Sequence, residues 1–315
     1  MIKRRDFAKT ALAVGTAWHA ACRGTAAGFD PQVDETLFDE TATDKSADDE
    51  TSPLRQSVMG WCFNPMSAET LAGHCRDIGL AAMEGIADTA YPNIRQRGLA
   101  ISLVGSHGFR TGPVDPENHA TVETQLRRGI DLAVRWGAPN VITFTGMRAD
   151  GISDASSRSN CLRCWKRVLP YAEAKGIGIV LEHLNSKAHR NHDGSIHPMK
   201  GHPGYWGDDI HQCADLVRAM ASDHFKLLFD VYHVQVMNGD VIANLRRYQD
   251  LIGHYHTAGN PGRGPLDDEQ EINYPAVFAA IKQTGFNGYV AHEFIPTGDD
   301  PIASLRQAYE LCKNA

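Results

Sequence analysis

The chain has 315 residues, of which 42% are hydrophobic, and its formal net charge is −7. No run approaches the roughly 18 apolar residues of a membrane span. The negative charge argues against nucleic acid as the main partner, because phosphate contacts need clustered Lys and Arg.

Residues 1–27 have the features of an export signal. The twin-arginine pattern Lys3-Arg4-Arg5-Asp6-Phe7 precedes a mildly apolar stretch at 11–21 and small residues that could be cleaved. We therefore expect twin-arginine export and a periplasmic location, with a frayed amphipathic N-terminus as the alternative. Cys22 is a candidate for lipid attachment, but His19 stands where such a site usually has Leu, so lipidation is the less favoured alternative.

Residues 28–52 are expected to form an acidic flexible linker. Between Asp30 and Glu50 there are nine acidic residues and one basic residue, Lys45. Such a segment cannot bury enough apolar surface to offset the entropy lost on ordering. The folded domain is therefore expected at 53–315.

From Ser57 onward, apolar runs alternate with helical patterns. Strands are expected at 57–63, 81–86, 99–107, 140–146, 177–185, 225–233, 252–260 and 288–294. Helices are expected at 68–78, about 89–97, 119–136, about 154–175, 208–222, 241–248, 274–284 and 301–312, several of them ending at a glycine. Eight apolar strands alternating with helices predict an α/β fold, a single-domain (β/α)8 TIM barrel. A doubly wound sheet is the alternative, but no glycine-rich phosphate loop follows the first strand.

Four polar residues stand at or near the ends of the last four expected strands. They are Glu182 in IGIVLEHLN, Asp230 in FKLLFDVYH, His256 in IGHYHTAGN and Glu293 in GYVAHEF. A buried carboxylate or imidazole is costly unless it meets a partner or a metal. One such residue alone would more often be a hydrogen-bonded structural group. Since the C-terminal strand ends of a barrel line one mouth, four on consecutive strands predict a shared metal site.

Three carboxylates and one imidazole suit a divalent Mg, Mn or Co ion better than structural zinc. Such an ion can chelate a carbonyl oxygen and the neighbouring hydroxyl, which lowers the cost of forming an enediolate. Glu182 and Glu293 lie three strands apart, so they can face each other and move a proton between adjacent carbons. His233 is a candidate for a hydrogen bond to a substrate oxygen, with a supporting or plain loop histidine as the alternative.

Further residues of the expected mouth follow strands two and three. Glu84 and His107 each fit substrate contact and a structural role equally well. The loop at 186–206 is long, covers the mouth and should set substrate choice. Its histidines are His189, His192, His197 and His202. These histidines fit an ordinary solvated loop better than a second metal site.

These motifs resemble the xylose isomerase-like barrel superfamily of sugar isomerases and epimerases, and within it hydroxypyruvate isomerase-like proteins. The resemblance covers residues from about 55 to 312 and is carried by QSVMGWCF, VLEHLN, LFDVYHVQ, GHYHTAGNPGRG, EINY and AHEF. It implies that Glu182, Asp230, His256 and Glu293 are metal ligands and that Glu182 and Glu293 are also the acid/base pair. It implies substrate contacts for His233 and for Arg263, whose planar guanidinium can bind two oxygens.

The expected function is a divalent-metal-dependent isomerase acting through an enediolate on a small hydroxy-carbonyl compound or sugar. The nearest named activity converts hydroxypyruvate to tartronate semialdehyde. Ketose 3-epimerisation or elimination from a keto-sugar would use the same site. A metal-dependent hydrolase fits less well, because only one proposed ligand is a histidine, and a non-catalytic sugar-binding module would predict a broken ligand set. Barrels of this family often pair, so a homo-oligomer stays open. Hydroxypyruvate isomerases are generally cytoplasmic, from which the export signal departs.

Overall fold

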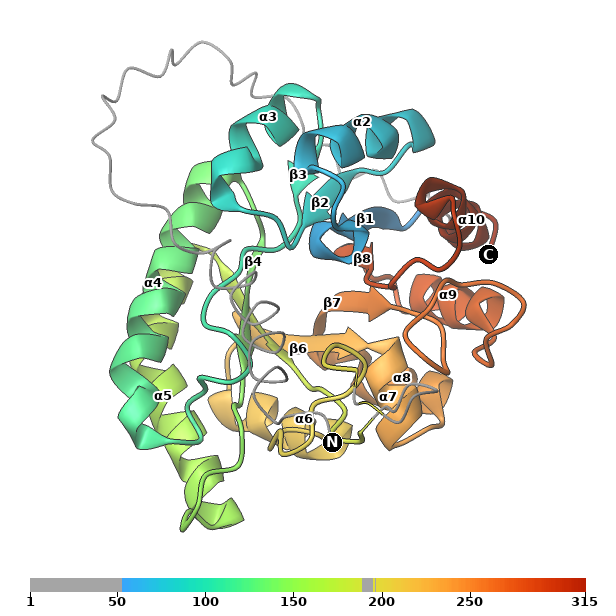
Figure 1. Cartoon of the computed structure of the whole chain (residues 1–315). Coiled ribbons are helices and arrows are strands. Elements are labelled where there is room, and N and C mark those ends of the chain that lie inside the picture. Colours follow the sequence, from blue (N-terminus) through green and yellow to red (C-terminus); the bar gives the residue numbers. More distant parts are fainter. Residues whose placement is uncertain (1–52, 189–194, 196) are drawn as a thin grey trace, which may run out of the picture.

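The computed structural model describes residues 53–188, 195 and 197–315 (Figure 1). The expected export signal, Cys22 and the whole of the expected linker lie outside the described residues, as do His189 and His192. Those expectations stay predictions. Within the described ranges, no helix has both the length and the apolar character that crossing a bilayer requires.

Eight parallel strands form one sheet in the order β3-β2-β1-β8-β7-β6-β5-β4. They are β1 (Arg55–Met59), β2 (Ala82–Glu84), β3 (Ala100–Ile101), β4 (Asn140–Phe144), β5 (Gly178–Glu182), β6 (Phe225–Asp230), β7 (Ile252–Thr257) and β8 (Tyr289–His292). A parallel bridge between Val104 and Val141 joins the chain after β3 to β4. The N–H of Val104 donates to the carbonyl of Asn140 over 3.0 Å, and this bond helps to close the ring. The expected TIM barrel fold is confirmed.

Helices lie around the outside of the strands (Figure 1). They are α2 (Ala68–Ile78), α3 (Tyr91–Gln96), α4 (His119–Trp136), α5 (Asp154–Ala174), α6 (Ile210–Met220), α7 (Val231–Met237), α8 (Val241–Tyr248), α9 (Tyr274–Gln283) and α10 (Pro301–Lys313). The bounds of α2 agree with the prediction because both ends carry strong local signals. The Ser67 side chain accepts the N–H of Thr70, and Gly79 ends the helix in the left-handed region at φ 107°.

All eight expected strands are shorter than predicted, and the differences at the first, third and sixth bear on the mouth of the barrel. The first ends at Met59, and Gly60–Phe63 is a 3-10 turn whose Trp61 N–H donates to the carbonyl of Gly85 over 3.2 Å. The third is reduced to Ala100–Ile101 plus the bridge at Val104. In both places loop contacts at the barrel mouth replace the ladder that the apolar run predicted.

The third correction, at β6, matters most for the site. Residues 231–233 were expected to continue the strand, but Val231–Met237 is helix α7. Asp230 ends β6 and caps α7, because its side-chain Oδ1 accepts the N–H of His233 over 3.1 Å. The strand-to-helix transition therefore sets the place of both Asp230 and His233.

Alternation along the strands separates the lumen of the barrel from its apolar shell. On β7, His254 and His256 contact Glu84 of β2 inside the barrel. Tyr255, between them, packs against Phe286 with ring centroids 4.8 Å apart, in the cluster beneath the helices. Successive strand residues point to opposite faces, so residues two apart share the lumen.

Candidate active site and metal centre

The structure brings the four predicted metal ligands together at the C-terminal end of the barrel. Glu182, Asp230, His256 and Glu293 each offer a ligand atom, and these atoms all lie within 4.8 Å of one another. The exposed fraction of each residue is 5% or less. Register accounts for part of this, because Asp230 of β6 is the Cα partner of His256 on β7.

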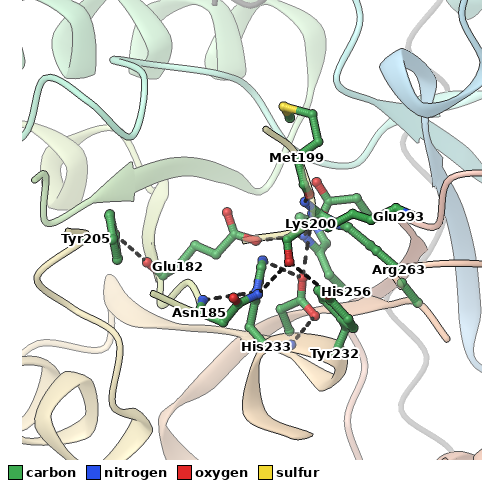
Figure 2. A network of polar contacts seen from close by, with 12 residues as sticks. Glu182, Asn185, Met199, Lys200, Tyr205, Tyr232, His233, His256, Arg263 and Glu293 are labelled. Carbon is green, nitrogen blue, oxygen red and sulfur yellow. Dashed lines mark hydrogen bonds and ion pairs between the residues drawn. The ribbon is translucent and has the colours of Figure 1, made fainter. Parts of the chain in front are cut away.

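His256 stands at the centre of the cluster (Figure 2). Its Nδ1 lies 2.7 Å from Glu293 Oε2 and 3.1 Å from Glu182 Oε1. Glu182 and Glu293 therefore both approach the same nitrogen of the imidazole. Burial by itself would lower the pKa of His256, but Glu293, Glu182 and Glu84 together raise it well above its ordinary value.

Arg263 reaches into the same cluster from the loop after β7. Its Nη2 lies 2.7 Å from Glu293 Oε2 and 3.9 Å from Asp230 Oδ2, and its side chain is almost completely buried. Its backbone adopts φ 55°, a strained region for a residue other than glycine. The guanidinium therefore balances part of the negative charge, at the position where a substrate contact was expected.

His233, at the start of α7, is held by Asn185, which follows β5. The backbone N–H of Asn185 lies 3.1 Å and its side-chain Nδ2 2.8 Å from His233 Nδ1. Nδ1 must therefore be the acceptor, and the ring proton is on Nε2. Nε2 is buried, has no hydrogen-bond partner among the described residues and lies 3.6 Å from Asp230 Oδ2. It is free to donate to a further group in the site.

A segment of the β5–α6 loop lies over these residues. The carbonyl of Met199 accepts from Arg263 Nη1 over 2.7 Å, and that of Lys200 accepts from Tyr232 Oη over 2.6 Å and from Asn185 Nδ2 over 3.1 Å. Figure 2 shows Met199 and Lys200 beside Arg263 and Tyr232. Through these main-chain carbonyls the segment braces Arg263 directly and His233 by way of Asn185. Patterns of side chains in the sequence do not reveal such contacts.

Glu84 and His107 have different surroundings. Glu84 lies behind His256, where its Oε1 is 2.7 Å from His256 Nε2, and Ser102 Oγ donates to its Oε2 over 2.6 Å. Its Oε2 also lies 2.9 Å from Nε2 of His254, a residue that the sequence analysis did not select. His107 Nε2 is 2.8 Å from Thr143 Oγ1, and burial lowers the pKa of this imidazole to about 4. The predicted substrate roles of Glu84 and His107 stay predictions.

His197 and His202 are the histidines of the 186–206 loop within the described residues. His202 is buried, and its ring lies against Phe109 with centroids 4.5 Å apart. Its pKa is lowered to about 3 by burial and by Arg263. His202 is therefore part of the packed wall above the site and not a solvated loop residue as was expected of this loop.

Without a cation, the three buried carboxylates of the cluster repel one another. Burial and the charge of Glu293 raise the pKa of Glu182 to about 7. The same two causes raise the pKa of Asp230 to about 6. Burial would also raise the pKa of Glu293, but Arg263 and His256 lower it to about 2. A positive ion among the three would relieve this repulsion.

Unmatched acceptor atoms support the same conclusion. Asp230 Oδ2 and Glu293 Oε2 are buried and lack a hydrogen bond from the part of the chain that the structure describes, although Glu293 Oε2 is close to two cationic groups. A contact of 2.7 Å without hydrogen-bond alignment leaves an oxygen available to a metal. With three carboxylates and one imidazole, the donor set fits a divalent Mg, Mn or Co ion. Which of these ions binds stays a prediction.

Comparisons with known proteins establish the family. Residues 75–315 match the family described as Xylose isomerase-like TIM barrel, and the chain belongs to this family. It is 34% identical over 228 residues to a putative hydroxypyruvate isomerase of Drosophila melanogaster, covering 70% of this chain and 81% of that protein. It is 25% identical over 277 residues to the putative hydroxypyruvate isomerase of Homo sapiens, covering 79% and 92%. The family inferred from the sequence motifs is confirmed.

Solved structures support the fold. A 3-keto-D-glucoside 4-epimerase from Escherichia coli superposes with a TM-score of 0.67 at 16% identity, covering 83% of this chain and 100% of that one. An L-ribulose 3-epimerase superposes with a TM-score of 0.66 at 16% identity, covering 82% and 92%. At this identity the likeness concerns the barrel and not the reaction.

Proposed function

We propose that the protein is a divalent-metal-dependent isomerase acting on a small hydroxy-carbonyl compound or sugar, with hydroxypyruvate as the nearest candidate substrate. The observation that carries this proposal is the convergence of Glu182, Asp230, His256 and Glu293 into one buried group of ligand atoms. Curated relatives named as hydroxypyruvate isomerases and as 2-oxo-tetronate isomerases support the reaction class.

In this proposal a divalent ion, when bound, polarises the carbonyl and adjacent hydroxyl of the substrate and lowers the cost of enediolate formation. Glu182 and Glu293 are the acid/base pair. Both carboxylates approach His256 Nδ1 although they come from β5 and β8, which are three strands apart in the sheet. One removes a proton from carbon, and the other returns a proton to the neighbouring carbon.

His233 and Arg263 orient the substrate. The Nε2–H of His233 has no hydrogen-bond partner in the described part of the chain and can donate to a substrate oxygen. Arg263 already contacts Glu293, so it can hold a second oxygen while keeping that carboxylate ionised. The Met199 carbonyl accepts from Arg263, and the Lys200 carbonyl accepts from Asn185, which in turn holds His233 Nδ1, so the segment helps to fix both side chains.

A location is proposed from the N-terminal motif alone. The twin-arginine pattern at Lys3-Arg4-Arg5 supports export and a periplasmic protein, in which 28–52 serves as a linker to the barrel at 53–315. Fractionation of cells producing the full chain, compared with an Arg4→Lys, Arg5→Lys variant, tests this. A variant that still reaches the periplasm would remove the proposal.

The reaction is tested by proton exchange at carbon. Full-length protein is loaded with Mg²⁺, Mn²⁺ or Co²⁺ and incubated in deuterated water with hydroxypyruvate and a set of ketoses. NMR then follows deuterium incorporation next to the carbonyl. We expect exchange and isomerisation that need the metal and are lost in Glu293→Gln and Glu182→Gln.

The substrate that exchanges separates the alternatives. Interconversion of hydroxypyruvate and tartronate semialdehyde supports the isomerase, and inversion at C3 of a ketose would favour the epimerase. Loss of a β-substituent from a keto-sugar would favour the lyase. Metal binding without exchange on any compound would count against the isomerase and favour a hydrolase or a binding module.

A further inference from the structure

We propose that Glu84, supported by His254, is a positioning residue for His256 and not a substrate contact. The inference rests on the metal role of His256 in the proposed function. It assigns Glu84 the task of keeping the Nε2 proton of His256 in place, so that Nδ1 is the nitrogen presented to the metal.

The contacts of Glu84 occupy its whole carboxylate. Oε1 lies 2.7 Å from His256 Nε2, while Oε2 accepts from Ser102 Oγ over 2.6 Å and lies 2.9 Å from His254 Nε2. Ser102 is itself 2.6 Å from Ser57 Oγ. Glu84, His254 and His256 are all at least 99% buried. A carboxylate engaged on both oxygens has little capacity left for a substrate.

The direction of the His256 hydrogen bond follows from its partner. A carboxylate oxygen at 2.7 Å accepts from a ring nitrogen that carries a proton, so Nε2 of His256 is an N–H. Nδ1, which contacts Glu182 Oε1 over 3.1 Å, carries a proton as well in the metal-free protein, and this is the proton that a bound cation would replace. Nδ1 then faces Glu182 and Glu293, on the side where the other ligand atoms gather. A carboxylate behind a ligand histidine fixes the ring orientation and makes the imidazole a stronger donor to the metal.

His254 keeps Glu84 in this orientation. It lies two residues before His256 on β7, so both imidazoles point into the lumen, with ring centroids 5.2 Å apart and planes at 83°. Through its 2.9 Å contact with Oε2, it leaves Oε1 directed at His256. Glu84 sits at the end of β2, three strands from β7 around the barrel. Glu84, His254 and His256 therefore form a chain of contacts across the lumen, called the relay below, beneath the other proposed metal ligands.

The test measures metal binding and the tautomer directly. Full-length wild-type protein and Glu84→Gln are titrated with Mn²⁺, and free Mn²⁺ is read by EPR. Histidine labelled with ¹⁵N in the Mg²⁺-loaded protein reports which nitrogen of His256 is protonated. We expect Mn²⁺ affinity to fall about 10–100-fold in Glu84→Gln. With the metal on Nδ1, Nε2 of His256 should be the protonated nitrogen in the wild type.

Kinetics separate positioning from substrate contact. At saturating metal, a positioning role predicts an unchanged KM for the substrate together with the weakened Mn²⁺ affinity. A raised KM with unchanged Mn²⁺ affinity would overturn the inference and restore Glu84 as a substrate contact. Two bound Mn²⁺ ions per chain, reduced to one in Glu84→Gln, would also overturn it, because Glu84, His254 and His256 would then hold a second ion.

Three further variants keep the result interpretable. If Glu84→Gln does not fold, Ser102→Ala removes one anchor of Glu84 and should weaken Mn²⁺ binding in the same direction by a smaller factor. Ser67→Ala removes the exposed cap of α2 and should lower stability while leaving Mn²⁺ affinity unchanged. His256→Ala checks the underlying function separately. If it binds Mn²⁺ as the wild type does, the metal role of His256 fails, whereas normal binding in Glu84→Gln alone removes only the relay.

Discussion

Asn185 donates from both its backbone and its side chain to a single nitrogen of His233, over 3.1 and 2.8 Å. Two donors at Nδ1 exclude a proton there, so the imidazole carries its proton on Nε2, within the site. Burial and the neighbouring Arg263 hold the pKa of His233 well below its usual range. His233 is therefore a neutral donor whose direction is set by the residue after the VLEHL strand.

The first prediction changes the side chain of Asn185 from a hydrogen-bond donor to an acceptor at His233 Nδ1. In Asn185→Asp, a carboxylate replaces the side-chain amide and favours a proton on Nδ1 of His233, against the donating backbone N–H. We expect kcat to fall by about 10–100-fold, as is usual when a residue that orients an active-site histidine is changed. Steady-state kinetics at saturating metal measure the effect.

Asn185→Ala is the matched control for that variant. It removes the side-chain amide but keeps the backbone donor, so the Nε2–H form of His233 is retained and the loss should be smaller than in Asn185→Asp. Equal losses in the two variants would mean that the brace to the Lys200 carbonyl, and not the tautomer of His233, is what Asn185 contributes.

The second prediction concerns metal removal and Asp230. An ion that binds only the folded chain at 100 times its Kd adds about 2.7 kcal/mol to the free energy of unfolding. For a domain of this size that raises Tm by about 5–10 °C relative to protein in EDTA. Differential scanning calorimetry with and without Mn²⁺ should show this shift in the wild type and lose most of it in Asp230→Asn.

Asp230 has a second role that the same measurement can separate. Its Oδ1 caps α7, and Asn is also a good N-cap, whereas Ala is not. In EDTA, Asp230→Ala should therefore be about 1 kcal/mol less stable than Asp230→Asn. Asp230→Asn itself should equal or exceed the wild type in EDTA, because it removes one of three crowded buried carboxylates. A metal-free Asp230→Asn far less stable than wild type would contradict this account.

The grouping of the four candidate metal ligands could be predicted because the C-terminal ends of all strands in a barrel meet at one mouth. Glu182, Asp230, His256 and Glu293 each end an apolar run, and the parallel topology leads all four runs to the same mouth. His254 was within reach of the same logic. It lies two residues before His256, so the two-residue period of a strand places both side chains in the lumen. A search restricted to the last residues of each strand does not select it.

Other features depend on contacts that no local pattern encodes. The apolar run of β6 continues into Val231 and Tyr232, which β-propensity assigns to the strand, whereas a side-chain cap at Asp230 starts α7. The Met199 and Lys200 carbonyls reach Arg263 and Tyr232 through tertiary packing of a loop, and main-chain acceptors leave no trace in residue identity.

The third prediction uses His107 to separate protein stability from site chemistry. Burial lowers the pKa of this imidazole to about 4 in the folded protein, against about 6.5 in an unfolded chain. The unfolded state therefore binds more protons between these values, so stability is full above about pH 6.5 and falls as the pH decreases toward 4. At pH 5 the contribution of His107 to this loss is about 2 kcal/mol.

His107→Gln should remove that contribution. Urea unfolding in EDTA at pH 7 and pH 5 gives the acid loss for each protein, and we expect the loss to be about 2 kcal/mol smaller in the variant. The absolute stability of the variant at pH 7 is its own control, since the lost contact with Thr143 acts equally at both pH values. The same acid loss in both proteins would show that His107 is not a buried neutral imidazole.

The fourth prediction tests whether the Met199–Lys200 segment matters for catalysis independently of the metal. A Cβ on Gly201 would lie 1.9 Å from the carbonyl oxygen of Lys187 and 2.8 Å from Asn185 Oδ1, so Gly201→Ala must displace the segment. The main-chain acceptors for Arg263 would move with it. Displacement of this order in substrate-positioning groups can reduce kcat/KM by about 100-fold.

The proposed metal ligands come from strand ends and not from this segment, so Mn²⁺ affinity should stay within about twofold of wild type in Gly201→Ala. Overpacking by the added methyl group should lower the free energy of unfolding by about 1–3 kcal/mol. Gly73→Ala is the matched control. It places the same methyl group on helix α2, where no atom lies within 4 Å, and should raise stability by about 0.5–1 kcal/mol without changing kinetics. Weakened Mn²⁺ binding in Gly201→Ala would mean that the Met199–Lys200 segment supports the proposed metal ligands themselves. An unchanged kcat/KM would mean that the position of Arg263 does not depend on this segment.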